Sequence, residues 1–136
     1  MKLTRQEEIA LLFASELARQ QDVFVPLSDI AGTHGVSVLF LKKIALCLKK
    51  HQLVISREGL NGGYKLGRKP EDISAWDIFT AVSGKSSGTE NVSGNFKCPL
   101  HSACLPQTIR LLISEAFRRY VSDVTIDQFI KSEKHI

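Results

Sequence analysis

The sequence predicts a mainly helical domain that carries one small β-hairpin. Three observations support this fold class: apolar residues recur at helical spacing in several segments, three of these segments open with a capping box, and a glycine-rich stretch separates two short β-type runs. The 136 residues suffice for one domain with a real core and are too few for most multidomain enzymes. The apolar share of 43% and the charged share of 24% are those of globular proteins, which excludes a disordered or collagen-like chain.

The N-terminal segment predicts a helix from Thr4 to about Gln20. Thr4 and Glu7 have the spacing of a capping box, and apolar residues then recur on one face at Ile9, Leu12, Phe13 and Leu17. The run VFVPL, residues 23–27, follows this helix. Because it contains a proline, which cannot donate to a sheet, it indicates an edge strand.

Two further helices are predicted next. Ser28 is expected to cap a short helix that Gly35 ends, and another helix is expected to begin at Val36 and Ser37. Its predicted core face is Val38, Leu41, Ala45 and Leu48, and its predicted solvent face is Lys42, Lys43, Lys49 and Lys50. Two short helices joined by a glycine-bearing turn, the second of them basic, are typical of a helix-turn-helix.

The stretch SREGLNGGYKLGR, residues 56–68, predicts a β-hairpin. The runs LVISR and GYKLGR have β-type composition, and EGLNGG between them supplies glycines that can adopt positive φ in a turn. A phosphate-binding loop would instead require a strand, the glycines and then a helix start, an order that this stretch lacks. A basic hairpin directly after a basic helix predicts a winged helix-turn-helix, in which the helix enters the major groove of DNA and the wing follows the backbone into the minor groove.

The composition changes after the hairpin. Ser74 and Asp77 have the spacing of a cap for a short helix. A stretch rich in Gly, Ser and Asn follows at 83–97 and leads into CPLHSAC, residues 98–104. This segment is expected to be a loop that presents two cysteines.

The C-terminal part predicts a long helix from Pro106 to about Val121 and a final short helix that Thr125 and Gln128 cap. The long helix carries one broad apolar stripe, at Ile109, Leu112, Ile113, Ala116, Phe117 and Tyr120. Such a stripe predicts dimerisation, packing against the first helix, or both. The expected organisation is a DNA-binding domain at residues 1–80 and a cysteine loop with a dimerisation helix at residues 81–136.

Positive charge is concentrated in residues 34–70. This segment has eight Lys and Arg residues against one acid, Glu58, whereas the rest of the chain has more acidic than basic residues. Such a segment is a candidate surface for a polyanion. The competing interpretation is a solvated surface with uneven charge.

The chain is expected to be cytoplasmic and associated with the nucleoid rather than with a membrane. No apolar run is long enough to span a bilayer, and two glutamates stand where a signal peptide would need an apolar core. Three cysteines are an odd number, which favours reduced thiols, a metal site or redox chemistry over a disulfide framework.

The order SDIAGTHGVSVLFLKKIALCLKKHQLVISREGLNGGYKLGRKPEDISAWDIFTAV resembles the bacterial winged-helix regulators that include the iron-sulphur assembly regulator, the nitric-oxide-sensing repressor and the cysteine-metabolism repressor. The resemblance covers essentially the whole chain, and the wing is its most specific part. It implies a homodimeric transcription regulator, often a repressor, that is not an enzyme and reads a pseudo-palindromic operator in double-stranded DNA. The residues expected to serve DNA contact are Ser37, Phe40, Lys42 and Lys43 in the helix and Arg57, Asn61, Gly62, Gly63 and Tyr64 in the wing. Several relatives carry Glu at the place of Lys42, so a different base preference is expected there.

The same resemblance implies an iron-sulphur cluster at the cysteine loop. Cluster-binding members supply three cysteines from this loop, of which Cys98 and Cys104 match the last two, while the first is missing and Gln107 stands where one subgroup has His. The implied ligand set is therefore these two thiolates with Glu8 from the partner subunit, and His101 as a candidate fourth ligand. A 2Fe-2S cluster is favoured over 4Fe-4S because it tolerates mixed ligation better.

Two other interpretations stay open. One is a cofactor-free winged-helix repressor that a partner protein, a metabolite or thiol oxidation controls. The other is a small thiol oxidoreductase, which the C-x5-C spacing and the lack of a thioredoxin-like βαβ order disfavour. Cys47 is expected to be a small core residue, and His34, His51 and His135 show no ligand spacing.

Overall fold

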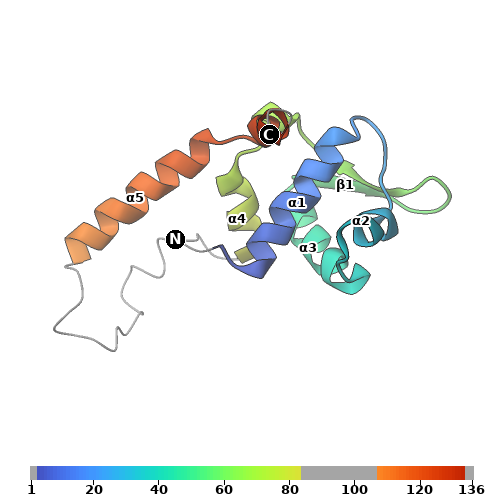
Figure 1. Ribbon diagram of the computed structural model, residues 1–136, viewed down its shortest axis with the longest axis horizontal. Coiled ribbons are helices and arrows are strands. Elements are labelled where there is room, and N and C mark those ends of the chain that lie inside the picture. Colours follow the sequence, from blue (N-terminus) through green and yellow to red (C-terminus); the bar gives the residue numbers. More distant parts are fainter. Residues whose placement is uncertain (1–2, 84–106, 134–136) are drawn as a thin grey trace.

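The computed structural model describes residues 3–83 and 107–133, and in these ranges it confirms a mainly helical fold with one hairpin (Figure 1). The elements are α1 (Arg5–Arg19), α2 (Leu27–His34), α3 (Val38–Lys50), β1 (Val54–Arg57), β2 (Gly63–Leu66), the 3-10 helix η1 (Pro70–Asp72), α4 (Ala75–Ser83), α5 (Gln107–Asp123) and α6 (Ile126–Glu133).

All three predicted capping boxes are present. The backbone amide of Thr4 donates to the Glu7 carboxylate at 3.0 Å, and the amide of Glu7 donates to the Thr4 hydroxyl at 3.1 Å. The same reciprocal pattern joins Ser74 to Asp77 and Thr125 to Gln128. Because each box satisfies two amides that a helix N-terminus leaves unpaired, the local sequence fixes the start of these helices.

The prediction that Ser28 caps the second helix is wrong. α2 begins at Leu27 with Pro26 as its N-cap residue, and no side chain caps it. Pro26 also explains why the predicted edge strand is reduced to one bridge: Val25 exchanges two backbone hydrogen bonds with Tyr64, at 2.8 and 2.9 Å, and the next residue has no amide to donate. The predicted end of α2 is confirmed, because Gly35 adopts the left-handed conformation there.

The core lies between α1, α3, α4, α6 and the hairpin. Phe13 of α1 is fully buried, and α1 packs against α3, α4, α6 and β2. In α3 the buried stripe is Leu41, Ile44, Ala45 and Leu48. Val38, predicted to belong to it, is instead 46% exposed, because it lies at the edge of this stripe.

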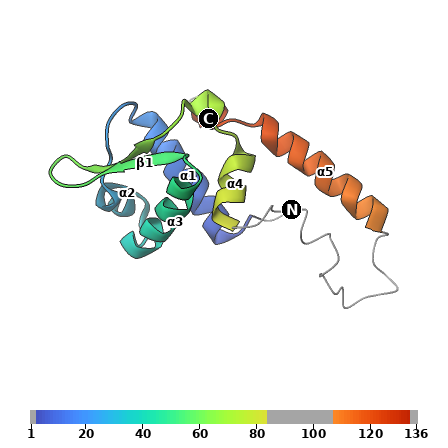
Figure 2. The same ribbon diagram turned by 180° about the vertical axis from the view of Figure 1, so that it is seen from behind.

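α5 and the hairpin lie at opposite ends of the molecule, as the two opposite views show (Figure 2). α5 packs against α4, mainly through Phe117 and Val121, and α6 packs against α1. Ile126 of α6 is fully buried in the main core, and its amide donates to the Ile73 carbonyl at 2.9 Å. The C-terminal helix therefore closes the same core that the N-terminal elements build. The division of the chain near residue 80 stays a prediction.

Candidate nucleic-acid interface

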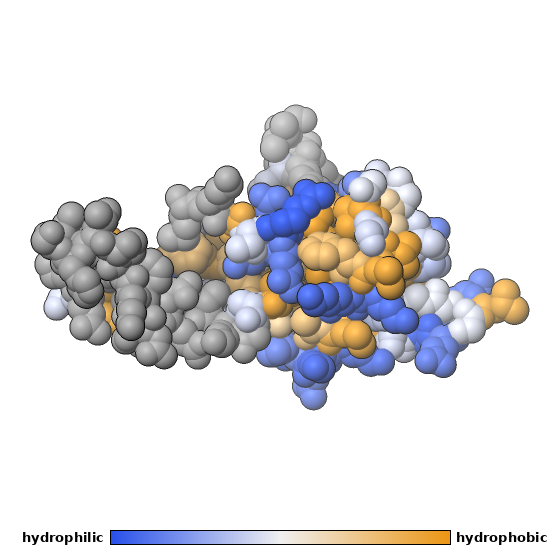
Figure 3. Space-filling model, turned by 90° about the horizontal axis from the view of Figure 1, so that it is seen from below, coloured by the Kyte–Doolittle hydropathy of each residue, from blue (hydrophilic) through white to orange (hydrophobic). Residues whose placement is uncertain are grey.

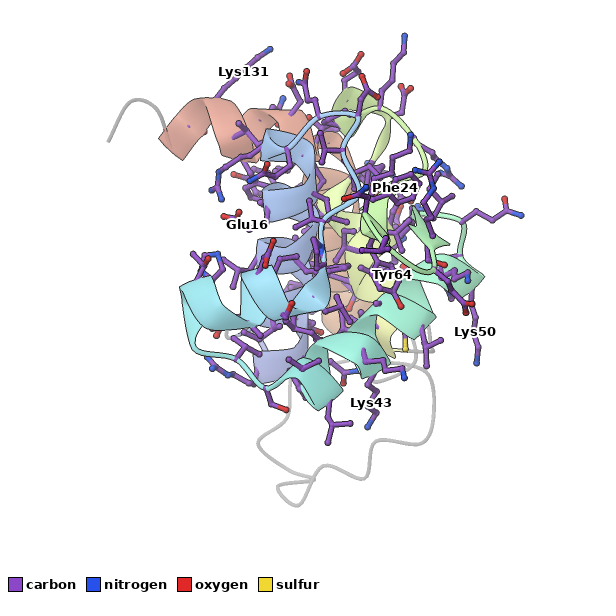
Figure 4. The ribbon with its side chains drawn as sticks, turned by 90° about the vertical axis from the view of Figure 1, so that its right-hand side faces the viewer. Glu16, Phe24, Lys43, Lys50, Tyr64 and Lys131 are labelled. Carbon is purple, nitrogen blue, oxygen red and sulfur yellow. The ribbon has the colours of Figure 1, made fainter. Side chains whose placement is uncertain are left out.

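The exposed side of α3 is a mixed basic and apolar stripe. Leu39, Lys42, Lys43 and Leu46 recur at helical spacing, and all four are exposed, Leu39 at 80% and Leu46 at 50%. In Figure 4, Lys43 and Lys50 point outward from α3 into open space. Because the opposite stripe of α3 is buried, this helix can present only this side to a ligand.

Ser37 and Phe40 stabilise the start of α3. The Ser37 hydroxyl caps the helix by accepting from the Phe40 amide at 3.3 Å. The Phe40 side chain is half-buried and packs against the core. Their predicted contact with DNA stays a prediction, and Ser37 keeps the exposure that such a contact needs.

The wing is an antiparallel hairpin whose tip projects from the domain. β1 pairs with β2 from Val54 opposite Leu66 to Arg57 opposite Gly63. In the turn, Leu60 is 97% exposed and Asn61 has a positive φ of 62°. The hydrophobic tip of the wing is visible at the right of Figure 3, and the surface behind it interleaves hydrophilic and hydrophobic groups.

Gly62 and Gly63 bring two segments of backbone into close approach. A Cβ at Gly62 would collide with the carbonyl oxygen of Arg57 and lie 2.8 Å from that of Gly59. Gly63 has a φ of 143°, and a Cβ there would lie 2.7 Å from the nitrogen of Pro26. These glycines are therefore required by the fold of the hairpin itself.

Tyr64 holds the wing to the body of the domain. Its ring lies edge-on to Phe13 of α1 with 6.0 Å between ring centroids, and its backbone bonds Val25. Since the ring is half-buried in this contact, the position of the hairpin depends on it. Contact of its hydroxyl with DNA stays a prediction.

Phe24 is a residue of this surface that sequence reasoning missed. The guanidinium of Arg57 lies 4.8 Å from the centre of the Phe24 ring, and the ammonium of Lys65 lies 5.0 Å from it. Both cations come from the hairpin, whereas Phe24 comes from the loop between α1 and α2. A pattern within one segment cannot reveal this cation–π contact, because it joins residues more than thirty positions apart.

A further hydrogen bond joins α3 to the wing. The ammonium of Lys49 donates to the Ser56 hydroxyl of β1 at 2.7 Å. The two parts that a winged domain presents to DNA are thus linked directly to each other, as well as through the core.

Of the four predicted ligands of an iron-sulphur cluster, the structure describes Glu8. Cys98, His101 and Cys104 lie outside the described residues. Glu8 is exposed in the first turn of α1, where the amide of the Gln6 side chain donates to the Val82 carbonyl at 3.2 Å. Glu8 therefore lies on the turn that touches the end of α4, the helix from which the cysteine segment departs in sequence.

His34, His51 and Cys47 belong to no metal site in the described ranges, and His135 lies outside them. No group of three or more His, Cys, Asp or Glu side chains there is arranged for a metal ion. Cys47 is half-buried and packs against the core, consistent with the predicted structural role. His34 lies 3.2 Å from Glu16 and joins α2 to α1.

α5 leaves most of its apolar stripe uncovered. The exposed fractions are 41% for Ile109, 66% for Leu112, 50% for Ile113 and 71% for Tyr120. Another side of the helix carries an ion pair. The Arg118 guanidinium donates two hydrogen bonds to the Glu115 carboxylate, at 2.6 and 3.0 Å, and these lower the pKa of that carboxyl. Among residues 3–83 and 107–133, no helix is long and apolar enough to cross a membrane.

Comparison with known proteins gives a consistent assignment. Residues 3–132 match the Rrf2 family, which is described as an iron-dependent transcriptional regulator. The HTH-type transcriptional regulator IscR of Vibrio atlanticus is 30% identical over 135 residues, which cover 98% of this chain and 78% of that protein. IscR of Pectobacterium atrosepticum is 27% identical over 98% of this chain and 82% of its own length.

Solved structures share the fold. CymR, the global cysteine regulator of B. subtilis, has a TM-score of 0.76 at 24% identity, with 97% of this chain and 98% of that chain covered. T. potens IscR also has a TM-score of 0.76, at 23% identity, with coverage of 98% and 88%. The chain, with its exposed basic helix and its hairpin wing, therefore belongs to the Rrf2 family of DNA-binding transcriptional regulators, which are not enzymes.

Proposed function

We propose that this chain acts as a homodimer that binds a pseudo-palindromic operator in double-stranded DNA and represses transcription there. The observation that carries the proposal is the lysine-bearing exposed side of α3, which lies beside a wing whose basic residues are held by Phe24. A helix of about 10–12 Å diameter fits the major groove of B-DNA, and Lys and Arg are the side chains that neutralise phosphates.

The predicted contact residues divide into two roles. Lys42 and Lys43 lie one turn into α3 and reach base edges, where lysine favours the O6 and N7 acceptors of guanine. Arg57 and Asn61 serve the wing, which follows the backbone. Gly62, Gly63 and Tyr64 support this role by fixing the shape and the position of the hairpin.

Dimerisation is proposed to occur through α5. Its uncovered stripe of Ile109, Leu112, Ile113 and Tyr120 is the surface that a second copy would bury. A two-fold axis would then pair two α3 helices and give two half-sites, which is why a pseudo-palindrome is expected.

The DNA proposal is tested by selecting duplexes from a random library with the full chain, followed by affinity measurement on the selected operator. The double variant Lys42→Gln, Lys43→Gln is expected to lose at least about tenfold in operator affinity. Lys131→Gln is the matched control, since Lys131 pairs with Asp127 at 2.8 Å on α6 and lies far from Lys43 (Figure 4). Equal operator affinities for the parent protein, the double variant and Lys131→Gln would refute the proposed interface.

We further propose that a 2Fe-2S cluster controls this activity. Cys98 and Cys104, with Glu8 from the second subunit and His101, form a donor set of thiolates with hard or borderline ligands that suits such a cluster. The exposure of Glu8 and its place beside the end of α4 support its role. When bound, the cluster would supply sensitivity to redox state, to iron-sulphur status or to nitric oxide.

The cluster is tested by the ultraviolet-visible spectrum of protein purified without oxygen, with iron and acid-labile sulphide counted per subunit. Matched iron and sulphide that fall in Glu8→Ala and His101→Ala variants support the proposed ligands. The presence of only two thiols in the cysteine segment favours one alternative, a cofactor-free repressor controlled by thiol oxidation, a metabolite or a partner protein. Colourless protein that binds its operator fully after reconstitution has failed would establish that alternative.

A further inference from the structure

Leu39 is the most exposed large apolar side chain of α3. It is 80% exposed, it lies in the first turn of the helix, and it shares a side with Lys42 and Lys43, three and four positions later. Val38 beside it is also 46% exposed. The start of α3 therefore presents an apolar group to solvent directly before its cations.

The major groove offers one apolar partner to such a group. Of the groups that base pairs present there, all are hydrogen-bond donors or acceptors except the C5-methyl of thymine. A leucine carries no donor or acceptor, so it can discriminate bases only through that methyl. The cations on the same side of α3 favour a polyanion over an apolar surface of a protein partner.

We propose that Leu39 is a specificity-determining residue that reads the methyl group of a thymine in each half-site of the operator. This inference rests on the proposed function, because it requires α3 to lie in the major groove. One helical turn rises 5.4 Å and one base pair 3.4 Å, so Leu39 and the lysines address base pairs about one or two steps apart. The operator is therefore expected to contain a thymine about one or two base pairs from the guanine that Lys42 or Lys43 reads.

The test replaces each operator thymine in turn by 2′-deoxyuridine, which removes the methyl group and leaves the hydrogen-bonding groups unchanged. Affinity is measured with the full chain on the operator selected from the random library. Removal of the contacted methyl is expected to lower the affinity about fourfold at one position of each half-site.

Two variants assign the effect to Leu39. Leu39→Ala is expected to lose the discrimination between thymine and deoxyuridine at that position while it still binds DNA. Val23→Ser is the control, since Val23 is also an exposed apolar residue, at 55%, but lies in the loop between α1 and α2. It is expected to retain the full fourfold effect, and circular dichroism verifies that both variants fold.

The outcomes separate the two proposals. Failure of the full chain to select or bind any duplex refutes the DNA-binding proposal itself. Strong operator binding that no deoxyuridine substitution weakens refutes the role of Leu39 and leaves DNA binding intact. The same holds if Leu39→Ala retains the thymine preference of the parent protein.

Discussion

Single aromatic side chains position the surface that we propose binds DNA. Phe24 lies beneath two cations of the hairpin, and Tyr64 lies against Phe13 in the core. An aromatic ring attracts a cation through the negative potential of its face, so Phe24 restricts both Arg57, which is exposed, and Lys65, which is half-buried. The conformational entropy of these flexible side chains is therefore already reduced in the free protein, so less of it is lost when DNA binds.

Replacement of Phe24 by leucine tests this positioning role. Leucine keeps the apolar character but has no ring potential, and each cation–π contact at an exposed site contributes about 0.5–1 kcal/mol. Phe24→Leu removes both contacts and is therefore expected to lower operator affinity about five- to thirtyfold, as measured by fluorescence anisotropy. Phe24→Tyr keeps the ring and is expected to bind like the parent, so an equal loss in both variants would contradict this explanation.

Gly63 is expected to be among the least replaceable glycines of the hairpin. Its φ of 143° and the contact of a built Cβ with the backbone of Val25 and Pro26 make any side chain strained. Gly63→Ala is expected to lower the free energy of unfolding by about 2 kcal/mol or more, as measured by urea denaturation.

Gly59 provides the matched control for that substitution. It also has a positive φ, 89°, but nothing lies within 4 Å of a Cβ built there. Gly59→Ala should therefore cost only the backbone strain, about 1 kcal/mol. Equal losses for the two variants would show that close approach to Val25 is not the cause.

At the scale of elements, the sequence predicts those features that local chemistry decides. The three capping boxes, the end of α2 at Gly35 and the hairpin turn all depend on neighbouring residues, and each is confirmed. The prediction that Ser28 caps α2 was wrong because α2 begins earlier, at Leu27. Pro26 is already in the extended conformation that an N-cap residue needs. The prediction that Val38 is a core residue was wrong because periodicity alone does not show how much of a helix other elements bury.

The candidate site is less predictable than the elements. Lys42 and Lys43 follow from helical spacing and charge, but Phe24 is brought to the wing by the path of a loop. The DNA contact predicted for Tyr64 stays a prediction, and the sequence did not show that its half-buried ring packs against the core. Tertiary contacts of this kind are visible only once the chain is folded.

The exposed stripe of α5 gives a prediction about assembly. Leu112→Glu places a charge within the proposed interface, where it would be desolvated without a partner. This variant is expected to be monomeric in analytical ultracentrifugation while its helical circular dichroism is retained. Ser122→Glu, at an exposed position of the same helix outside the stripe, should remain dimeric. A dimeric Leu112→Glu variant would refute this interface.

At the scale of the whole molecule, charge is separated along the chain and across the surface. The basic segment at residues 34–70 builds α3 and the wing, and the rest of the chain carries an acidic excess. Such a separation orients the protein as it approaches a polyanion and accelerates productive encounter, an effect that salt weakens.

The salt dependence of binding distinguishes contacts to phosphates from contacts to bases. Lys50 lies at the exposed C-terminal end of α3, where the proposed recognition helix would approach the DNA backbone. Lys50→Gln is expected to weaken binding to all sequences alike and to reduce the slope of log affinity against log salt by about one. Lys42→Gln should instead relax the preference at one base pair, as measured on operators with single substitutions. An unchanged slope in Lys50→Gln would exclude the phosphate contact.

α1 contacts both the end of α4 and the hairpin. The part of α1 from Gln6, whose side chain bonds the Val82 carbonyl at the end of α4, to Leu17 spans about 16 Å, and Phe13 between them contacts Tyr64 of the wing. Protein interiors are packed as densely as organic crystals and transmit strain, so α1 is a direct physical connection between the end of α4 and the contact that seats Tyr64 of the wing.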